Sequence, residues 1–300
     1  MKARTDIVHL EWLKQPEVTL AIRREDLLFP ELSGNKFRKL RLNLEAAKNL
    51  GYHRLLTFGG AFSNHIHATA AAGKLFGFET LGFIRGDELA NSSLNPTLQD
   101  ARRAGMQLIF LPRSQYALRN NPDFQERLLR DYGPGYLLPE GGTNALAVAG
   151  CTEILQSGDS GYDQICCAVG TGGTLGGLVR ASAKHQQVIG YSVLKGAGLE
   201  KELQAFIPER HWQLRQTSHF GGYGKVTPEL VAFINDFKRK TGIPLDPVYT
   251  GKMMLALLED IRTGRVPAGS RVLAIHTGGL QGIRGMNQQL AKKTLPLLEL

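Results

Sequence analysis

The sequence predicts an α/β fold, in which parallel strands are covered by helices. Short apolar runs alternate with stretches of helical spacing along the 300 residues, and this alternation is typical of parallel sheets with helices on their faces. Glycine-rich turns follow several of the apolar runs, and such sheets bind ligands at the carboxyl ends of their strands. The composition is that of a folded globular chain, since 42% of the residues are hydrophobic and 21% are charged.

The expected elements follow one another in a regular order. Apolar runs predict strands at residues 54–58, 79–84, 107–111, 135–138, 164–169, 187–193 and 271–275. Helical spacing predicts helices at residues 63–76, 95–104, 123–132, 144–155 and 174–185, and a further helix begins near Asn35. No Pro- or Ser-rich linker is present, so a division into domains has to arise from chain crossings rather than from a tether.

The charge and the cysteines of the chain exclude several classes of protein. Lys and Arg number 36 against 27 Asp and Glu, a formal charge of +9. These basic residues are scattered and are not interleaved with aromatic residues, so we expect small anionic ligands rather than nucleic acid. The three cysteines include the adjacent pair Cys166 and Cys167, which fits neither a disulfide framework nor a zinc motif. Burial in a strand is the expected place of this pair.

The distribution of apolar residues predicts a protein without a membrane segment. No apolar run reaches the length of about 18 residues that a membrane-spanning helix requires. The first residues, MKARTDIVHLEWLK, mix charges among the apolar positions and lack the apolar core of a signal peptide. We therefore expect a cytoplasmic location.

A glycine-rich stretch at residues 169–177, VGTGGTLGG, follows a strand and opens a helix. Free N–H groups and the helix dipole at such a position favour an anion, and Thr171 and Thr174 add hydroxyl groups. The dinucleotide-binding pattern requires glycine where Leu175 stands, and the P-loop pattern requires a Gly-Lys-Ser/Thr end that is missing. A phosphate site and a tight turn without a ligand both remain compatible with this stretch.

A second motif, SGNKFRKL at residues 33–40, places Lys36 at a helix start. A lysine amine is nucleophilic only when it is unprotonated, and the neighbouring cations Arg38 and Lys39 would lower the pKa of Lys36. Asn35 is a candidate N-cap of this helix. A solvated basic helix start is the alternative interpretation.

A third motif, GGAFSNH at residues 59–65, is another glycine turn that leads into a helix. Ser63 is a candidate N-cap, and it does not stand in the Gly-x-Ser-x-Gly elbow of serine hydrolases. His65 and His67 are two positions apart, so on a helix their side chains point about 200° apart. We therefore expect no metal site here.

Five motifs in one order, SGNKFRKL, GGAFSNH, GTGGT, DPVYTGK and HTGG, resemble a single family. It is the pyridoxal-phosphate (PLP) dependent family that contains 1-aminocyclopropane-1-carboxylate (ACC) deaminase and D-cysteine desulfhydrase, within the tryptophan-synthase-β-like fold type II. The resemblance runs from about residue 20 to residue 285. It implies two open, twisted, mostly parallel sheets with flanking helices, and PLP in a cleft between two domains. The implied domains are residues 1–47 plus 148–300 and an inserted smaller domain at residues 48–147, in a homodimer.

The resemblance implies specific roles for residues of these motifs. Lys36 matches the lysine that forms the Schiff base with PLP and moves the proton at Cα of the substrate, and Lys39 matches a second lysine near the cofactor. Asn64 matches the residue that hydrogen-bonds the ring hydroxyl, and Ser63, Asn64 and His65 match positions that bind the substrate. The phosphate is implied to lie on Gly170, Thr171, Gly172, Gly173 and Thr174.

Two tyrosines match a catalytic pair of the family, Tyr223 in GGYG and Tyr249 in DPVYTGK. Such a tyrosine can exchange a proton near the leaving group. Thr250 follows the second tyrosine, where ACC deaminases have glutamate near the ring nitrogen, and Thr277 stands where they have leucine. A hydroxyl there sustains a weaker electron sink than a carboxylate, which favours β-elimination over opening of a cyclopropane.

The resemblance therefore implies a PLP-dependent lyase that acts on a small amino acid. D-Cysteine desulfhydrase activity, which gives pyruvate, sulfide and ammonia, is the expected reaction. ACC deaminase is the alternative, as is a lyase for another D-amino acid or for L-cysteate. His67 replaces a common arginine and Glu140 lies in an unusual PEGGTN turn, and both departures would reshape the substrate pocket. A PLP carrier without activity would not need the two tyrosines and Ser63.

Overall fold

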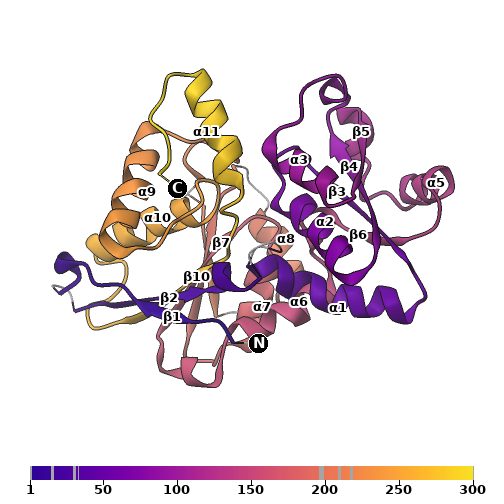
Figure 1. Cartoon of the computed structure of the whole chain (residues 1–300). Coiled ribbons are helices and arrows are strands. Elements are labelled where there is room, and N and C mark those ends of the chain that lie inside the picture. The colour runs from indigo at the N-terminus through magenta and orange to yellow at the C-terminus, as the bar shows by residue number, and fades with distance from the viewer. Residues whose placement is uncertain are drawn as a thin grey trace.

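Two sheets, each flanked by helices, form the protein in the computed structural model (Figure 1). The structure describes residues 2–14, 17–29, 32, 34–195, 199–208, 211–216 and 219–299. Ser33 of the lysine motif thus lies outside the described residues. No helix in the described ranges is both long and apolar enough to cross a membrane.

The larger sheet has six strands in the order β1-β2-β10-β7-β8-β9. All its neighbouring strands are parallel except the antiparallel pair β1–β2. Its strands are β1 (Thr5–Ile7), β2 (Thr19–Arg24), β7 (Gln164–Val169), β8 (Gln187–Ser192), β9 (Trp212–Arg215) and β10 (Arg271–His276).

The smaller sheet has four strands in the order β5-β4-β3-β6, all parallel. They are β3 (Arg54–Gly59), β4 (Glu79–Arg85), β5 (Gln107–Leu111) and β6 (Tyr136–Leu138). The predicted α/β class with two mostly parallel sheets is thereby confirmed. The boundaries of the inserted domain at residues 48–147 stay a prediction.

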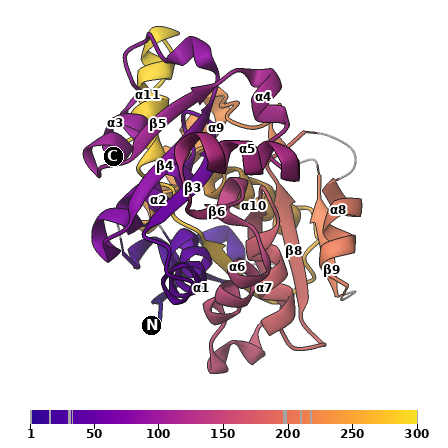
Figure 2. The same ribbon diagram turned by 90° about the vertical axis from the view of Figure 1, so that its right-hand side faces the viewer.

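Helices connect and cover the strands, as Figures 1 and 2 show from two sides. α1 joins the two sheets, because it follows β2 in the chain, precedes β3, and packs on α6 and α2. The helices are α1 (Asn35–Asn49), α2 (Asn64–Phe76), α3 (Pro96–Arg103), α4 (Arg113–Ala117), α5 (Pro122–Tyr132), α6 (Ala145–Cys151), α7 (Gly173–Ala181), α8 (Leu199–Phe206), α9 (Pro228–Thr241), α10 (Thr250–Arg262) and α11 (Gly282–Lys292).

Both faces of the larger sheet are buried. Successive side chains of a strand point to opposite faces, so Cys166 lies in one apolar cluster and Cys167 in the cluster on the other face. Both cysteines are fully buried, as the apolar run of β7 predicts, and burial raises the pKa of the Cys167 thiol to about 12. Neither thiol is thus ionised at neutral pH, and packing accounts for the pair.

Candidate active site

One cavity of about 570 Å³ gathers residues from all five sequence motifs. Its walls come from the start of α1, from the turns that follow β3, β7 and β10, and from the turn that precedes α10. The turns after β7 and β10 lie together because parallel strands end at the same edge of a sheet, and the turn after β3 reaches the cavity from the smaller sheet. The expected site residues that line it are Lys36, Lys39, Ser63, Asn64, His65, Gly170, Thr171, Gly172, Thr174, Tyr223, Tyr249 and Thr277. Gly173 and Thr250 lie behind its wall.

The backbone at Gly34 explains how Lys36 enters the cavity. Gly34 is the N-cap of α1 with φ 58°, and a Cβ there would stand 2.3 Å from the carbonyl oxygen of Thr277. Asn35 is the first helical residue rather than the cap, so its predicted capping role is wrong. Its side chain instead donates to Thr174 Oγ1 at 2.7 Å, which ties the start of α1 to the start of α7.

The surroundings of Lys36 favour the unprotonated form of its amine. Burial, and then the charge of Lys39, hold the pKa of Lys36 well below its usual range, and its Nζ donates only a long 3.3 Å bond to the carbonyl of Gly141. Arg38, which was expected to contribute, is bound to the buried Glu25 carboxylate by two hydrogen bonds of 2.9 and 3.1 Å. That expectation is wrong because the side chain of Arg38 turns to Glu25, so that its charge is neutralised.

Lys39 supplies the fixed cation of the cavity. Its Nζ donates to Thr143 Oγ1 at 2.9 Å and to the Gly141 carbonyl at 3.1 Å, and it lies 3.5 Å from Thr171 Oγ1. Thr171 belongs to the glycine-rich loop after β7, so the ammonium stands beside that loop. These contacts place positive charge next to the start of α7.

The loop after β7 has the form of an anion cradle. Gly172, the N-cap of α7, has φ 82°, and a Cβ on it would lie 2.1 Å from Leu203 Cδ2. A side chain at Gly173 would approach Lys39 Nζ to 3.1 Å. Backbone N–H groups of a helix start, the hydroxyl of Thr171 and the Lys39 ammonium are the donor set that a phosphate requires.

Ser63 and Asn64 present polar groups at the start of α2. Ser63 is the N-cap, and its Oγ accepts hydrogen bonds from the backbone N–H groups of His65 and Ile66 at 3.2 and 3.3 Å, as predicted. The hydroxyl proton of Ser63 stays available to the cavity. Asn64 Oδ1 accepts from Gln281 Nε2 at 2.7 Å, which orients the NH₂ group of Asn64 away from Gln281 as a donor.

The imidazole of His65 is a buried, neutral acceptor. Burial, and then the charges of Lys36 and Lys39, hold its pKa well below the usual range. Thr57 Oγ1 donates to the Leu138 carbonyl at 3.1 Å and therefore accepts from His65 Nε2 at 2.8 Å. Nδ1 then carries a lone pair, and no described residue bonds to it. The role in substrate binding that the resemblance implies for His65 stays a prediction.

His67 faces a different neighbour. Its Nε2 lies 3.8 Å from Asp100 Oδ2, and Asp100 belongs to α3. His65 and His67 thus turn to different partners, and in the described parts of the chain no cluster of three or more His, Cys, Asp or Glu is arranged to hold a metal.

The two tyrosines meet at the cavity. Tyr249 Oη donates to Tyr223 Oη at 3.3 Å, and their rings stand edge to face with centroids 6.0 Å apart. Burial raises the pKa of both phenols, that of Tyr249 well above its usual range. Both are therefore protonated at neutral pH, and the pair can donate a proton to a group in the cavity.

Asp246, the first residue of the DPVYTGK motif, organises the turn before α10. Its Oδ2 accepts from the backbone N–H groups of Val248 and Tyr249 at 2.9 and 3.0 Å, and its Oδ1 accepts from the backbone N–H and the hydroxyl of Thr250 at 2.7 and 2.8 Å. Asp246 lines the cavity, whereas Thr250 is fully buried. The hydroxyl of Thr250 is thus engaged by Asp246, and its implied contact with a cofactor ring stays a prediction.

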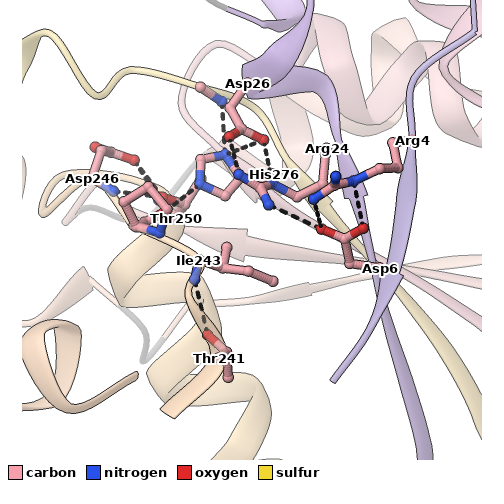
Figure 3. A network of polar contacts seen from close by, with 11 residues as sticks. Arg4, Asp6, Arg24, Asp26, Thr241, Ile243, Asp246, Thr250 and His276 are labelled. Carbon is pink, nitrogen blue, oxygen red and sulfur yellow. Dashed lines mark hydrogen bonds and ion pairs between the residues drawn. The ribbon is translucent and has the colours of Figure 1, made fainter. Parts of the chain in front are cut away.

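His276 ties this turn to the end of β10 (Figure 3). Its Nε2 lies 2.6 Å from the Pro244 carbonyl and therefore donates to it, while Nδ1 accepts from the N–H of Gly278 at 3.2 Å. Asp26 lies 3.4 Å from the same ring and is held by Arg24. The turn that carries Tyr249 and the turn that carries Thr277 are thereby fixed to one buried side chain.

Two charged residues, Glu140 and Arg85, line the cavity as well. The carboxylate of Glu140, in the PEGGTN turn after β6, accepts from Tyr116 Oη at 2.7 Å and from Arg119 Nε at 2.5 Å. Arg85, at the end of β4, lines the same cavity with an exposed side chain. Only the tertiary structure brings Arg85 to the site, because β4 carries no motif.

Comparisons with known proteins agree with this geometry. A family model described as "Pyridoxal-phosphate dependent enzyme" matches residues 2–278. A Pyrococcus horikoshii protein, provisionally named a 1-aminocyclopropane-1-carboxylate deaminase, is 31% identical over 87% of this chain and 84% of its own length. An Arabidopsis thaliana protein, named as a mitochondrial bifunctional D-cysteine desulfhydrase/1-aminocyclopropane-1-carboxylate deaminase, is 30% identical over 91% of this chain and 75% of its own. The crystal structure of an ACC deaminase homologue matches with a TM-score of 0.84 and 27% identity, over 97% of this chain and 94% of that one.

Proposed function

Because this chain belongs to the family of pyridoxal-phosphate dependent enzymes, we propose that it is a lyase that converts D-cysteine and water to pyruvate, sulfide and ammonia. The relatives place it with the ACC deaminases and D-cysteine desulfhydrases. The choice of D-cysteine among their substrates, and the roles of single residues, are our proposal. One observation carries it: Lys36, whose pKa is lowered by burial, and the phenols of Tyr249 and Tyr223, whose pKa values are raised by burial, line one cavity.

The residues of the cavity fit pyridoxal phosphate. The loop after β7 and Lys39 form a cradle for the phosphate, and a side chain on Gly172 would disturb it. Lys36 would supply the amine that bonds to the aldehyde, and the NH₂ group of Asn64 would donate to a ring oxygen. When bound, this cofactor stabilises negative charge at the Cα atom of an amino acid.

The side chains of this chain supply binding and proton transfer. The hydroxyl of Ser63 and the start of α2 offer donors to the carboxylate of the substrate. The amine of Lys36 takes the proton from Cα. The hydrogen-bonded pair of phenols, Tyr249 and Tyr223, gives a proton to the sulfur as the Cβ–S bond breaks, so that sulfide leaves in a protonated form. Water then supplies the oxygen that replaces nitrogen in pyruvate.

Thr250 and Thr277 support D-cysteine as the substrate, because ACC deaminases have glutamate and leucine at these positions. ACC itself is the second candidate. The observation that favours it is the carboxylate of Asp246, which lines the cavity one turn before the position of that glutamate. A carboxylate near the cofactor would strengthen the electron sink that opening of a cyclopropane requires.

Release of 2-oxo acid by the purified, cofactor-loaded protein separates these candidates. D-cysteine, L-cysteine, ACC, D-serine and L-cysteate are assayed in parallel at equal concentration. We expect turnover of D-cysteine and at least about 100-fold slower turnover of ACC. With Thr250 in place of the glutamate, the transition state for opening the cyclopropane is less stabilised. Turnover of ACC without turnover of D-cysteine would replace our proposal with the second candidate.

A further inference from the structure

The loop that carries Tyr223 has an unusual backbone. Phe220, Gly221, Gly222 and Gly224 have φ values of 47°, 90°, 121° and 67°, a conformation that costs free energy for any residue with a side chain. Tyr223 itself is 46% exposed. Two backbone hydrogen bonds close turns within this stretch, from Gly222 to His219 at 3.0 Å and from Lys225 to Gly222 at 3.2 Å. These two bonds do not attach the loop to the rest of the molecule.

A buried lysine makes that attachment. Lys252, in the first turn of α10, has no exposed surface. Its Nζ donates to the backbone carbonyls of His219 and Gly222 at 2.9 and 2.8 Å. A buried ammonium is unfavourable unless its hydrogen bonds are satisfied, and charge-assisted bonds to carbonyls are stronger than neutral ones. Both carbonyls lie on the N-terminal side of Tyr223, one of them on the adjacent residue.

From these contacts we propose that Lys252 is a positioning residue, which holds the loop 219–225 so that the Tyr223 hydroxyl stays against Tyr249 at the cavity. Lys252 itself does not line the cavity. Its effect on the reaction passes through Tyr223, and this part rests on the proposed function. The placement of the loop is independent of any substrate.

The same helix start links the two tyrosines. Tyr249 immediately precedes α10, whose first residues include Lys252. Asp246 caps this turn and its charge favours the ammonium form of Lys252. A single helix terminus thus fixes Tyr249 through the backbone and Tyr223 through one side chain.

Hydrogen exchange of the full-length, cofactor-loaded protein tests the proposal. Lys252→Met keeps the length of the side chain without its donors, and Lys240→Met, an exposed lysine of α9, is the matched control. We expect exchange in peptides that cover residues 219–225 to rise at least about 10-fold in Lys252→Met alone. Unchanged exchange of this loop would overturn the proposal. If Lys252→Met does not fold, Lys252→Gln keeps two N–H donors and should show the same change with smaller amplitude.

A double-mutant cycle tests the link to Tyr223. Tyr223→Phe and Lys252→Met are measured singly and together for kcat and KM with the substrate that the protein turns over. If Lys252 acts through Tyr223, each single variant lowers kcat by about 10–100-fold and the double variant is no slower than Tyr223→Phe. Independent, multiplicative losses would contradict it. Absence of activity with D-cysteine would defeat the proposed function but leave the exchange result as the test of the loop.

Discussion

The two walls of the cavity are held in different ways. The wall that includes the start of α7 is packed from behind, because Gly172 touches Leu203 and Asn35 bonds to Thr174. The wall that carries Tyr223 is a half-exposed loop, to which Lys252 donates two hydrogen bonds and Tyr249 one. Binding of a cofactor phosphate requires a fixed cradle, whereas a proton donor at the mouth of a cavity can belong to a segment of lower local stability. In the proposed function, the packed wall at the start of α7 binds the phosphate of the cofactor, and the loop that carries Tyr223 takes part in turnover.

Removal of the Lys36 amine should have the largest effect. Lys36→Ala deletes the nucleophile and base but leaves the cradle beside α7 in place. We expect kcat to fall by about 10⁴-fold or more, while the phosphate group of the cofactor is still bound. Stopped-flow turnover and equilibrium dialysis of pyridoxal phosphate measure the two quantities. Retained turnover would show that Lys36 is not the reacting lysine.

The tyrosines should differ in the size of their effects. Tyr249 belongs to a turn that Asp246 and His276 fix, so Tyr249→Phe should lower kcat by about 100–1000-fold with little change in KM. Tyr223→Phe should cost less, because Tyr223 is half-exposed and water can replace its hydroxyl group. Steady-state kinetics of both variants decide the order. A larger loss of kcat in Tyr223→Phe would show that Tyr223 is the more important phenol of the pair.

The packed wall predicts a stability effect with an internal control. Gly172 and Gly269 have φ values of 82° and 78°, but a Cβ meets Leu203 in the first case and nothing within 4 Å in the second. Gly269→Ala should lower the free energy of unfolding by about 1 kcal/mol through backbone strain alone. Gly172→Ala should lower it by about 1–3 kcal/mol more, because the new Cβ overlaps with Leu203. Urea unfolding gives both values. Equal losses would mean that Leu203 moves aside freely.

The buried ammonium of Lys252 predicts a small dependence of stability on pH. Burial lowers its pKa from 10.5 to about 8, so between these values the unfolded chain binds more protons and the folded state gains stability as pH rises. From pH 7 to pH 9 the wild type should gain about 1 kcal/mol relative to Lys252→Met. Parallel pH profiles of the two proteins would contradict a lowered pKa.

Much of the fold could be predicted from the sequence because parallel strands buried on both faces are continuous apolar runs. All seven strands that such runs predicted are present, within one or two residues at each end. The short strands β1 and β9 contain polar residues and gave no such signal. Strand β2 and helices α8 to α11 received no prediction, although Thr227, Pro228 and Gly242 mark both ends of α9 as cap, first turn and stop signals.

The residues of the candidate site could likewise be predicted only in part. Residues in local motifs, such as Lys36 and Thr171, were predicted because glycine turns and helix starts have local signatures. Asp246 and Lys252 stand in the DPVYTGK motif without a predicted role, and Arg85 lies in no motif. The contacts of Lys252 and Arg85 depend on which turns meet in space, and one sequence does not record that. The expected helix at residues 174–185 stops at Ala181, because Ser182 is extended.

The central claim is that this cavity catalyses β-elimination from D-cysteine, with Lys36 as the base. The most direct measurement follows sulfide and pyruvate together during turnover of D-cysteine by the cofactor-loaded wild type and by Lys36→Ala. Our account predicts equal amounts of the two products from the wild type and neither above background from the variant. Sulfide and pyruvate formation by Lys36→Ala at the wild-type rate, or no product from D-cysteine with 2-oxo acid from ACC, would contradict it.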